Sequence, residues 1–191
     1  MYGYKGFTLV ELLVTIAIAG ILATVAVPSF TAVIKNNRLI AKTNDLVSDI
    51  NLARSEAIKR GTRVILCHSA DPSVSNPTCS GSANTWTTGW LMFASGDTNG
   101  TFDTATDTLI QIGQPARSSL TIKTNNVAAD NLEYNPDGTT NEGGGIAVFA
   151  LCDDRGEQYG RQIQVNAAGR PLLINGSTTS PIPNCAAPVA A

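Results

Sequence analysis

Histidine, charge and long apolar runs are all scarce in this chain of 191 residues. His68 is the only histidine, charged residues make up 15% of the chain, and aromatic residues make up 6%. General acid–base chemistry needs a base within reach of a nucleophile, and no G-x-S-x-G elbow accompanies the lone imidazole. With 13 basic residues against 15 acidic ones, the net charge is −2, so no general excess of positive charge favours nucleic acid. The composition therefore predicts a non-enzymatic protein without a cofactor.

Only one long apolar run is present, and it lies close to the N-terminus. Residues 7–34 contain 20 apolar residues out of 28, and Glu11 is their only charge. As an α-helix, residues 7–27 span roughly 31 Å, which matches the ~30 Å hydrocarbon layer of a bilayer. A secretory signal has a shorter apolar stretch and a small-residue cleavage site after it, and neither applies here. We expect a single membrane crossing, in which Glu11 needs a partner because an unpaired acid in hydrocarbon is costly.

The residues before this run carry a specific motif. A short basic leader ends at Gly6, and Phe7-Thr-Leu-Val-Glu11 follows. This arrangement resembles the prepilin leader of type IV pilins and type II secretion pseudopilins. The resemblance implies that a prepilin peptidase cuts between Gly6 and Phe7 and methylates the new amino group of Phe7. The freed amine and Glu11 lie one helical turn apart, so each can neutralise the other or the same group of a neighbouring subunit. We expect Glu11 to act in assembly in this way.

The helix is expected to continue beyond the membrane as an amphipathic segment, residues 35–60. Pro28 removes one backbone hydrogen bond and predicts a kink or local melting. A Glu56–Arg60 pair and Gly61 predict the end of the helix. The expected apolar stripe consists of Phe30, Val33, Ile34, Ile40, Val47, Ile50, Ala53 and Ala57, and the charged residues, Lys42 and Asp49 among them, are expected on other faces.

From residue 61 onward, short β-like runs alternate with turn residues. The fold class that follows is α+β, a long N-terminal helix packed on a mainly antiparallel β-sandwich head. The expected organisation is a leader of residues 1–6, a transmembrane and filament-core helix of residues 7–34, an amphipathic helix of residues 35–60 and a head of residues 61–191. The expected strands are Arg63 to His68, Gly89 to Ala94, Thr108 to Ile112, Leu120 to Lys123, Gly145 to Cys152, Arg161 to Asn166 and Pro171 to Ile174.

The four cysteines, Cys67, Cys79, Cys152 and Cys185, contain no C-x-x-C unit. Zinc binding is therefore not expected, whereas two disulfides suit a head exported to an oxidising compartment. Three pairings are possible. We favour Cys67 with Cys79 and Cys152 with Cys185, which close a proline-rich loop and pin the C-terminal tail.

Two other groups of residues are candidate sites. The spacing of Asp97, Asn99, Asp103 and Asp107 does not match a calcium-binding loop, so a turn is expected there and no metal site. Trp86 and Trp90 could form a surface for another subunit, but aromatic residues beside a strand are more often part of the core.

Short motifs in the head extend the resemblance. They are Trp90-Leu-Met-Phe with Asp97-Thr-Asn-Gly, Tyr134-Asn-Pro-Asp-Gly, Phe149-Ala-Leu-Cys-Asp, and Gly160-Arg-Gln-Ile-Gln-Val-Asn with Gly169-Arg170. These segments resemble the FimU, FimT and GspH group of minor pilins and minor pseudopilins. The resemblance implies a minor pilin at or near the tip of a type IV pilus that primes assembly with other minor pilins. A GspH-like pseudopilin of type II secretion is the alternative.

A third possibility is a FimT-like minor pilin that binds DNA. The FimT likeness includes a Gly-Arg-x-Arg element, but here Gly169-Arg170-Pro171-Leu172 lacks the second arginine. Residues 61–191 carry six basic and 11 acidic side chains, so DNA binding is not expected unless Arg161 and Arg170 cluster.

The resemblance also implies where the protein resides and what it contacts. We expect a single-pass protein of the bacterial inner membrane with its head in the periplasm, which later moves to the pilus at the cell surface. The partners implied are other minor and major pilins or pseudopilins, the prepilin peptidase, the inner-membrane assembly machinery, and membrane lipid before assembly.

Overall fold

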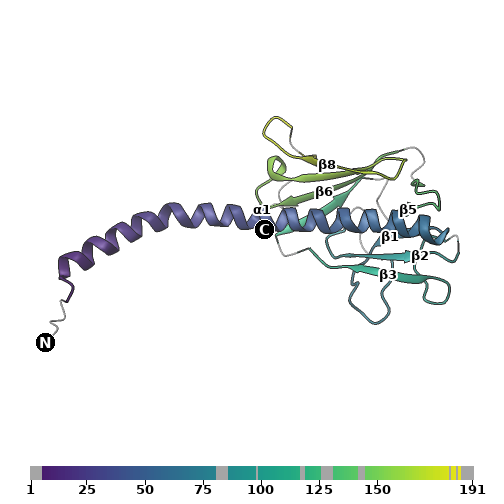
Figure 1. Cartoon of the computed structure of the whole chain (residues 1–191), viewed down its shortest axis with the longest axis horizontal. Helices are drawn as coiled ribbons and strands as arrows, with labels where there is room; N and C mark the ends of the chain where they lie inside the picture. The colour runs from purple at the N-terminus through teal and green to yellow at the C-terminus, as the bar shows by residue number, and fades with distance from the viewer. Residues whose placement is uncertain are drawn as a thin grey trace. The chain divides into compact units, whose positions relative to one another are not determined.

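The computed structural model describes residues 6–80, 86–97, 99–116, 119–125, 131–141, 145–180, 182–183 and 185. Helix α1 spans Leu9–Arg60 (Figure 1). The strands of the head are β1 (Val64–His68), β2 (Trp90–Ala94), β3 (Thr108–Gly113), β4 (Leu120–Thr124), β5 (Asn131–Tyr134), β6 (Ala147–Asp153), β7 (Arg161–Val165) and β8 (Pro171–Asn175), with a short 3₁₀ helix η2 (Glu157–Tyr159) before β7.

The chain divides into two compact units inside α1, between Arg38 and Leu39. The first unit ends at Arg38, and the second contains the last part of α1 together with the head. The division falls within the expected amphipathic segment, so residues 39–60 belong structurally to the head.

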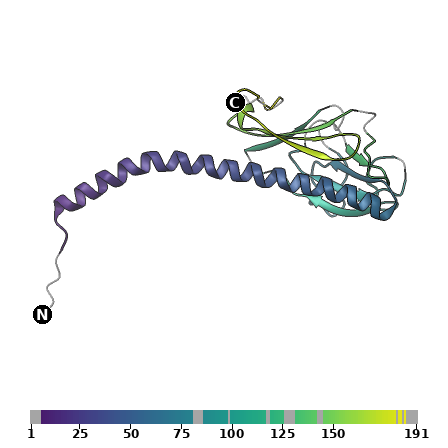
Figure 2. The same cartoon turned by 45° about the horizontal axis from the view of Figure 1, so that its top comes forward.

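The head contains two four-stranded sheets. The first has the strand order β3-β2-β1-β5 and the second has the order β4-β6-β7-β8. Every strand pair is antiparallel. Residues 39–60 of α1 run along the head with β6 and β8 on one side and β2 and β3 on the other (Figures 1 and 2). The expected α+β class is confirmed.

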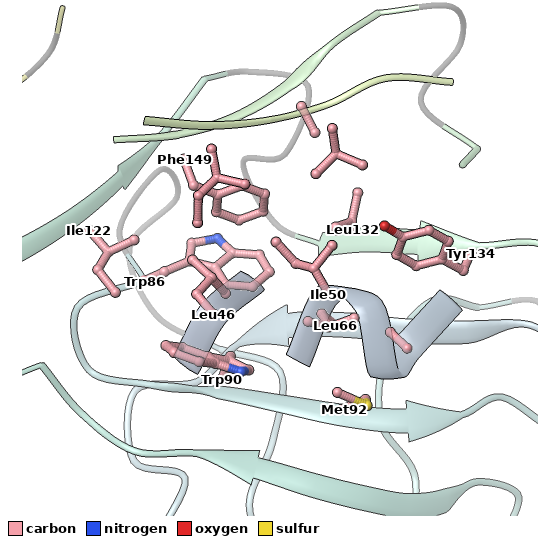
Figure 3. Packing of buried hydrophobic residues seen from close by; sticks show 14 of the residues in the cluster. Leu46, Ile50, Leu66, Trp86, Trp90, Met92, Ile122, Leu132, Tyr134 and Phe149 are labelled. Atoms are coloured by element: carbon pink, nitrogen blue, oxygen red, sulfur yellow. The ribbon is translucent and has the colours of Figure 1, made fainter. Parts of the chain in front are cut away.

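The main core lies where α1 meets both sheets. Leu46 and Ile50 of α1 reach between Phe149 of the second sheet and Leu66 of the first (Figure 3). Both tryptophans are buried in this core, and the rings of Trp86 and Phe149 meet edge to face at 4.9 Å between centroids. The core, and not a free surface, therefore accounts for the tryptophans.

The inward face of α1 differs from the expected stripe. Ile50, Ala53 and Ala57 are buried as expected, together with Leu39 and Leu46, whereas Phe30, Val33 and Ile34 are exposed. The expectation that Lys42 and Asp49 face away from the head is wrong, because both side chains are buried against the first sheet. Hydrogen bonds satisfy both charged groups: Asp49 accepts from Trp90 and Gln111, and Lys42 donates to the Gln114 carbonyl.

The end of α1 agrees with the sequence. The amide of Gly61 donates to the carbonyl of Ala57 over 3.0 Å, and Gly61 adopts a φ of 65° that suits glycine. Arg60 Nε lies 2.5 Å from Glu56 Oε2.

The expected strands are all present within a residue or two of their predicted ends, but β5 was not predicted. It pairs with β1 and places Glu133 opposite Ile65. Arg63 neutralises this carboxylate at 2.6 Å. A buried charged residue in a four-residue strand breaks the apolar alternation by which strands are identified.

Candidate functional site

The N-terminal segment presents an uncovered apolar surface. Phe7 is 89% exposed, and the large apolar side chains from Leu9 to Ile34 that the structure describes are exposed as well. Within the described ranges, α1 is the one helix long and apolar enough to cross a membrane, by length and composition. A surface of this kind is stable only in lipid or against other apolar helices.

Gly6 and Phe7 precede the first turn of α1 and are exposed. A Cβ added at Gly6 would meet no heavy atom within 4 Å.

Thr8 and Glu11 form a reciprocal capping box at the start of α1. Glu11 Oε2 accepts hydrogen bonds from the amide and from the hydroxyl of Thr8, each at 3.0 Å, and the amide of Glu11 donates to Thr8 Oγ1 over 3.3 Å. This pairing satisfies amide groups that a helix N-terminus otherwise leaves free. Thr8 was overlooked in the sequence, although T-x-x-E before an apolar run is a known start signal.

Helix α1 runs through Pro28 without interruption, so the helix does not melt there. The hydroxyl of Thr31 donates to the Pro28 carbonyl over 2.8 Å.

The cysteines form two disulfides, Cys67–Cys79 and Cys152–Cys185. These are the pairings that the sequence favours. Each fastens a segment to the outer face of a sheet, where Cys67 packs with Phe93, and Cys152 packs with Ile182 of the C-terminal tail.

Oxygen-bearing side chains between β2 and β3 organise a turn. Asp107 accepts hydrogen bonds from the amides of Gly96 and Asp103, both at 2.9 Å, and Asp97 accepts one from the amide of Asn99 at 3.0 Å. Their oxygens serve the local backbone, as expected of a turn. In the part of the chain that the structure describes, no three metal-ligating side chains gather.

Arg161 and Arg170 lie toward opposite ends of the β7–β8 hairpin. Arg161 is opposite Asn175, whereas Arg170 precedes Pro171, which is opposite Val165 at the other end. The two arginines are not neighbours, because four residues of strand, about 13 Å, separate the two ends of the hairpin, and a phosphate-binding role for them stays a prediction.

A buried polar contact holds α1 against the first sheet. Trp90 Nε1 donates to Asp49 Oδ2 over 2.8 Å, and Gln111 Nε2 donates to Asp49 Oδ1 over 2.5 Å. The ammonium group of Lys42 lies over the Trp90 ring, 4.4 Å from its centroid, and donates to the Gln114 carbonyl.

Burial perturbs both charged groups of this contact. It raises the pKa of the Asp49 carboxyl, against the opposing effect of the hydrogen bond from Trp90. Burial also lowers the pKa of the Lys42 ammonium, against the attraction of the carboxylates of Asp45 and Asp49. The contact therefore fixes the helix to the sheet by directional bonds made at an electrostatic cost.

These features together define a subunit of the pilin type. An exposed apolar helix follows the Gly6–Phe7 motif, and a disulfide-bonded head of two antiparallel sheets follows the helix. A sequence model for the prokaryotic N-terminal methylation motif matches residues 1–27. The model described as Type II transport protein GspH matches residues 42–169, about two thirds of the chain. The chain belongs to this GspH family of minor pseudopilins and minor pilins.

Solved structures of similar fold include two crystal forms of the type IV minor pilin FimU of Pseudomonas aeruginosa. The form in space group P21 is 20% identical, with a TM-score of 0.57, and the match covers 79% of this chain and 97% of that one. The form in P65 is 21% identical, with a TM-score of 0.51, covering 71% and 92%. No curated protein sequence matches the chain.

Proposed function

We propose that this protein is a minor pilin that enters a type IV pilus at or near its tip and primes assembly together with other minor pilins. The observation that carries the proposal is the exposed Gly6–Phe7 segment, followed within one turn by Glu11 on an uncovered apolar helix. Before assembly the apolar helix resides in the inner membrane and the head lies in the periplasm; afterwards the head is part of the pilus.

The proposed organisation follows the chemistry of each segment. Residues 1–6 are removed by the prepilin peptidase, and residues 7–34 serve the membrane and then the filament core. Residues 35–60 join that helix to the head, residues 61–191. The new amine of Phe7 is methylated. The two disulfides stabilise the head, which lies in an oxidising compartment.

Glu11 supports assembly because its present hydrogen bonds are replaceable. In the single chain the amide and the hydroxyl of Thr8 donate to the Glu11 carboxylate. The cationic amine of an incoming subunit is a stronger partner for a carboxylate in hydrocarbon than a hydroxyl, so subunit addition neutralises two charges at once and sets the axial register. Pro28 is proposed as the point where the helix bends during packing.

The test compares Glu11→Ala with the wild type in cells that carry the full assembly machinery. We expect normal cleavage after Gly6, shown by mass spectrometry of the mature N-terminus, and a loss from sheared filaments of about tenfold or more because the incoming amine lacks its counter-charge. Glu56→Gln is the matched control, since Glu56 is a carboxylate on the same helix outside the apolar segment.

Two outcomes would overturn the proposal. One is Glu11→Ala chains that enter filaments as efficiently as the wild type. The other is functional filaments containing this chain with residues 1–6 still attached.

A second candidate is a minor pseudopilin of type II secretion. The description of the matching family, Type II transport protein GspH, favours it, whereas the FimU structures favour the pilus only through their fold. Loss of the chain would then abolish protein secretion and leave pili intact. Measuring both phenotypes in one deletion strain separates the two candidates.

A further inference from the structure

Strand β8 forms an uncovered edge of the second sheet. No residue of β8 is fully buried, and Leu172 and Leu173 are 60% and 40% exposed. The strand lies at the margin of the head, next to β7 (Figure 1).

The direction of the backbone groups of β8 follows from its pairing with β7. The amide of Gly176 donates to the carbonyl of Gly160 over 2.8 Å, and hydrogen-bonded pairs recur every second residue in an antiparallel ladder. The pairs Gln162–Ile174 and Gln164–Leu172 therefore exchange hydrogen bonds. The amides and carbonyls of Leu173 and Asn175 consequently point away from the sheet.

Pro171 agrees with this assignment. It has no amide hydrogen, and it occupies a position whose amide would point outward. Leu172 and Ile174, whose amides point toward β7, keep their amide hydrogens.

The other sheet margins are covered or interrupted. The amide of Trp86 donates to the carbonyl of Ile122 over 2.9 Å and covers β4, and the amide of Asn141 donates to the carbonyl of Glu133 over 3.1 Å and covers β5. A register shift opposite Met92 and Phe93 interrupts β3. Bulges and covering segments are the usual protection of free edges. Within the described ranges, β8 has neither a bulge nor a covering segment.

Positive charge flanks this edge. Arg170 precedes β8, and Arg161 lies across from its last residue, Asn175. Arg63 and Arg155 of the head are ion-paired, with Glu133 and Asp153, whereas Arg161 and Arg170 make no ion pair with any residue that the structure describes. Two unpaired cations in a head with 11 acidic and six basic residues provide a local attraction for carboxylates.

We infer that β8 receives an extended segment of another pilin-type subunit as an added β-strand. The backbone of Leu173 and Asn175 supplies the hydrogen bonds. Leu172 and Leu173, which point to opposite faces of the sheet, contact apolar side chains on the two faces of that segment, and Arg161 and Arg170 pair with carboxylates at its ends. This inference rests on the proposed function, because it requires a second subunit beside the head.

Hydrogen exchange of the full chain tests the inference, first in detergent and then in isolated filaments. In the single chain the amides of Leu173 and Asn175 should exchange freely while those of Leu172 and Ile174 are protected. In filaments the two outward amides should slow by about tenfold or more, which reports their new hydrogen bonds. The inference would be overturned if the amides of Leu173 and Asn175 exchanged as fast in filaments that contain the chain as they do in the single chain.

Three variants identify the occupant. Leu173→Pro removes an outward amide and Leu173→Ala removes only the side chain, so the proline variant should lose more of the partner contact. Because Leu173→Pro could also disturb folding, the double variant Arg161→Glu/Arg170→Glu, which leaves the backbone intact, serves as the independent test. We expect about a tenfold loss of cross-linking from a photoreactive residue at position 175.

The cross-linked peptide decides among sources. An extended segment of another subunit supports the inference, whereas DNA, lipid or the apolar N-terminal helix of a neighbour overturns it. If the chain never enters filaments, the proposed function fails. If the chain enters filaments with β8 still exposed, only the present inference fails.

Discussion

Removal of the Asp49 carboxylate should loosen the hold of α1 on the head. In Asp49→Ala the indole N–H of Trp90, a residue that is 1% exposed, loses its acceptor, which lies at 2.8 Å in the wild type. A buried unpaired donor costs about 1–3 kcal/mol. Gln111 also loses its hydrogen bond to Asp49, at a small cost because Gln111 is partly exposed and can turn to water. The variant no longer has to bury a carboxylate, and this gain largely offsets the loss at Gln111. We expect a net loss of about 2 kcal/mol of unfolding free energy.

Urea denaturation of the full chain in detergent measures this loss. The chain has two tryptophans, both in the core, so fluorescence reports the integrity of the head. Asp45→Ala is the matched control, because Asp45 is an exposed carboxylate one turn earlier on the same helix. It should change the unfolding free energy by about 0.5 kcal/mol or less.

A double-mutant cycle with Trp90→Phe isolates the hydrogen bond itself. A bond to a charged acceptor predicts a coupling of about 1.5–3 kcal/mol between positions 49 and 90. A coupling near zero, or equal losses in Asp49→Ala and Asp45→Ala, would refute the reasoning.

The same carboxylate predicts a dependence on pH. Because burial raises the pKa of Asp49 above its ordinary 3.8, the folded state holds this proton more tightly than the unfolded state. The extra stability that comes from this tightly held proton is therefore present below about pH 4 and is lost as pH rises through the raised pKa, whereas the hydrogen bond from Trp90 to Asp49 remains. The stability of wild type relative to Asp49→Asn should decrease over this interval, and a difference that increases with pH would contradict the assignment.

Two further perturbations act on the head. Replacement of the Cys152–Cys185 pair by serines opens a span of 33 residues and should cost about 3.7 kcal/mol, against about 2.8 kcal/mol for Cys67–Cys79 with its span of 12, as compared in one urea series; the reverse order would show that segment packing, not loop closure, governs the effect. Gly113→Ala would place its Cβ 2.0 Å from the Trp90 indole, so we expect a loss of about 1–3 kcal/mol or more in the same assay, and an unchanged midpoint would contradict the close approach.

The features best predicted from the sequence are those written in consecutive residues. The length of the apolar run predicts the helix, and the position of Glu11 within the run marks its N-terminal end, without any tertiary information. Turn residues likewise bound most strands. The cysteine pairing could be favoured because Cys67–Cys79 closes a proline-rich loop and Cys152–Cys185 pins the C-terminal tail.

The features not predicted depend on contacts distant in sequence. Lys42 and Asp49 were expected to face solvent because isolated charges usually do. The donors that make burial of Asp49 tolerable come from 41 and 62 residues further along the chain. Strand β5 was missed for the same reason, since the partner of Glu133 is Arg63, 70 residues earlier.

Two carboxylates on one helix illustrate how the same chemical group serves different purposes. Asp49 is held by donors from two strands of the sheet, and releasing it would leave the Trp90 N–H unpaired in the core. Among the residues that the structure describes, Thr8 is the partner of Glu11; it lies three residues away and is exposed, so its donors can be replaced by another partner without disturbing the packing of the head. A fixed carboxylate suits the permanent joint between helix and sheet, and an exchangeable one suits a group that must change partners when a subunit is added. Thr8→Ala should therefore leave the stability of the head unchanged while altering the efficiency with which the chain enters filaments. Asp49→Ala should do the opposite: it should lower the stability of the head and leave the efficiency of filament entry unchanged.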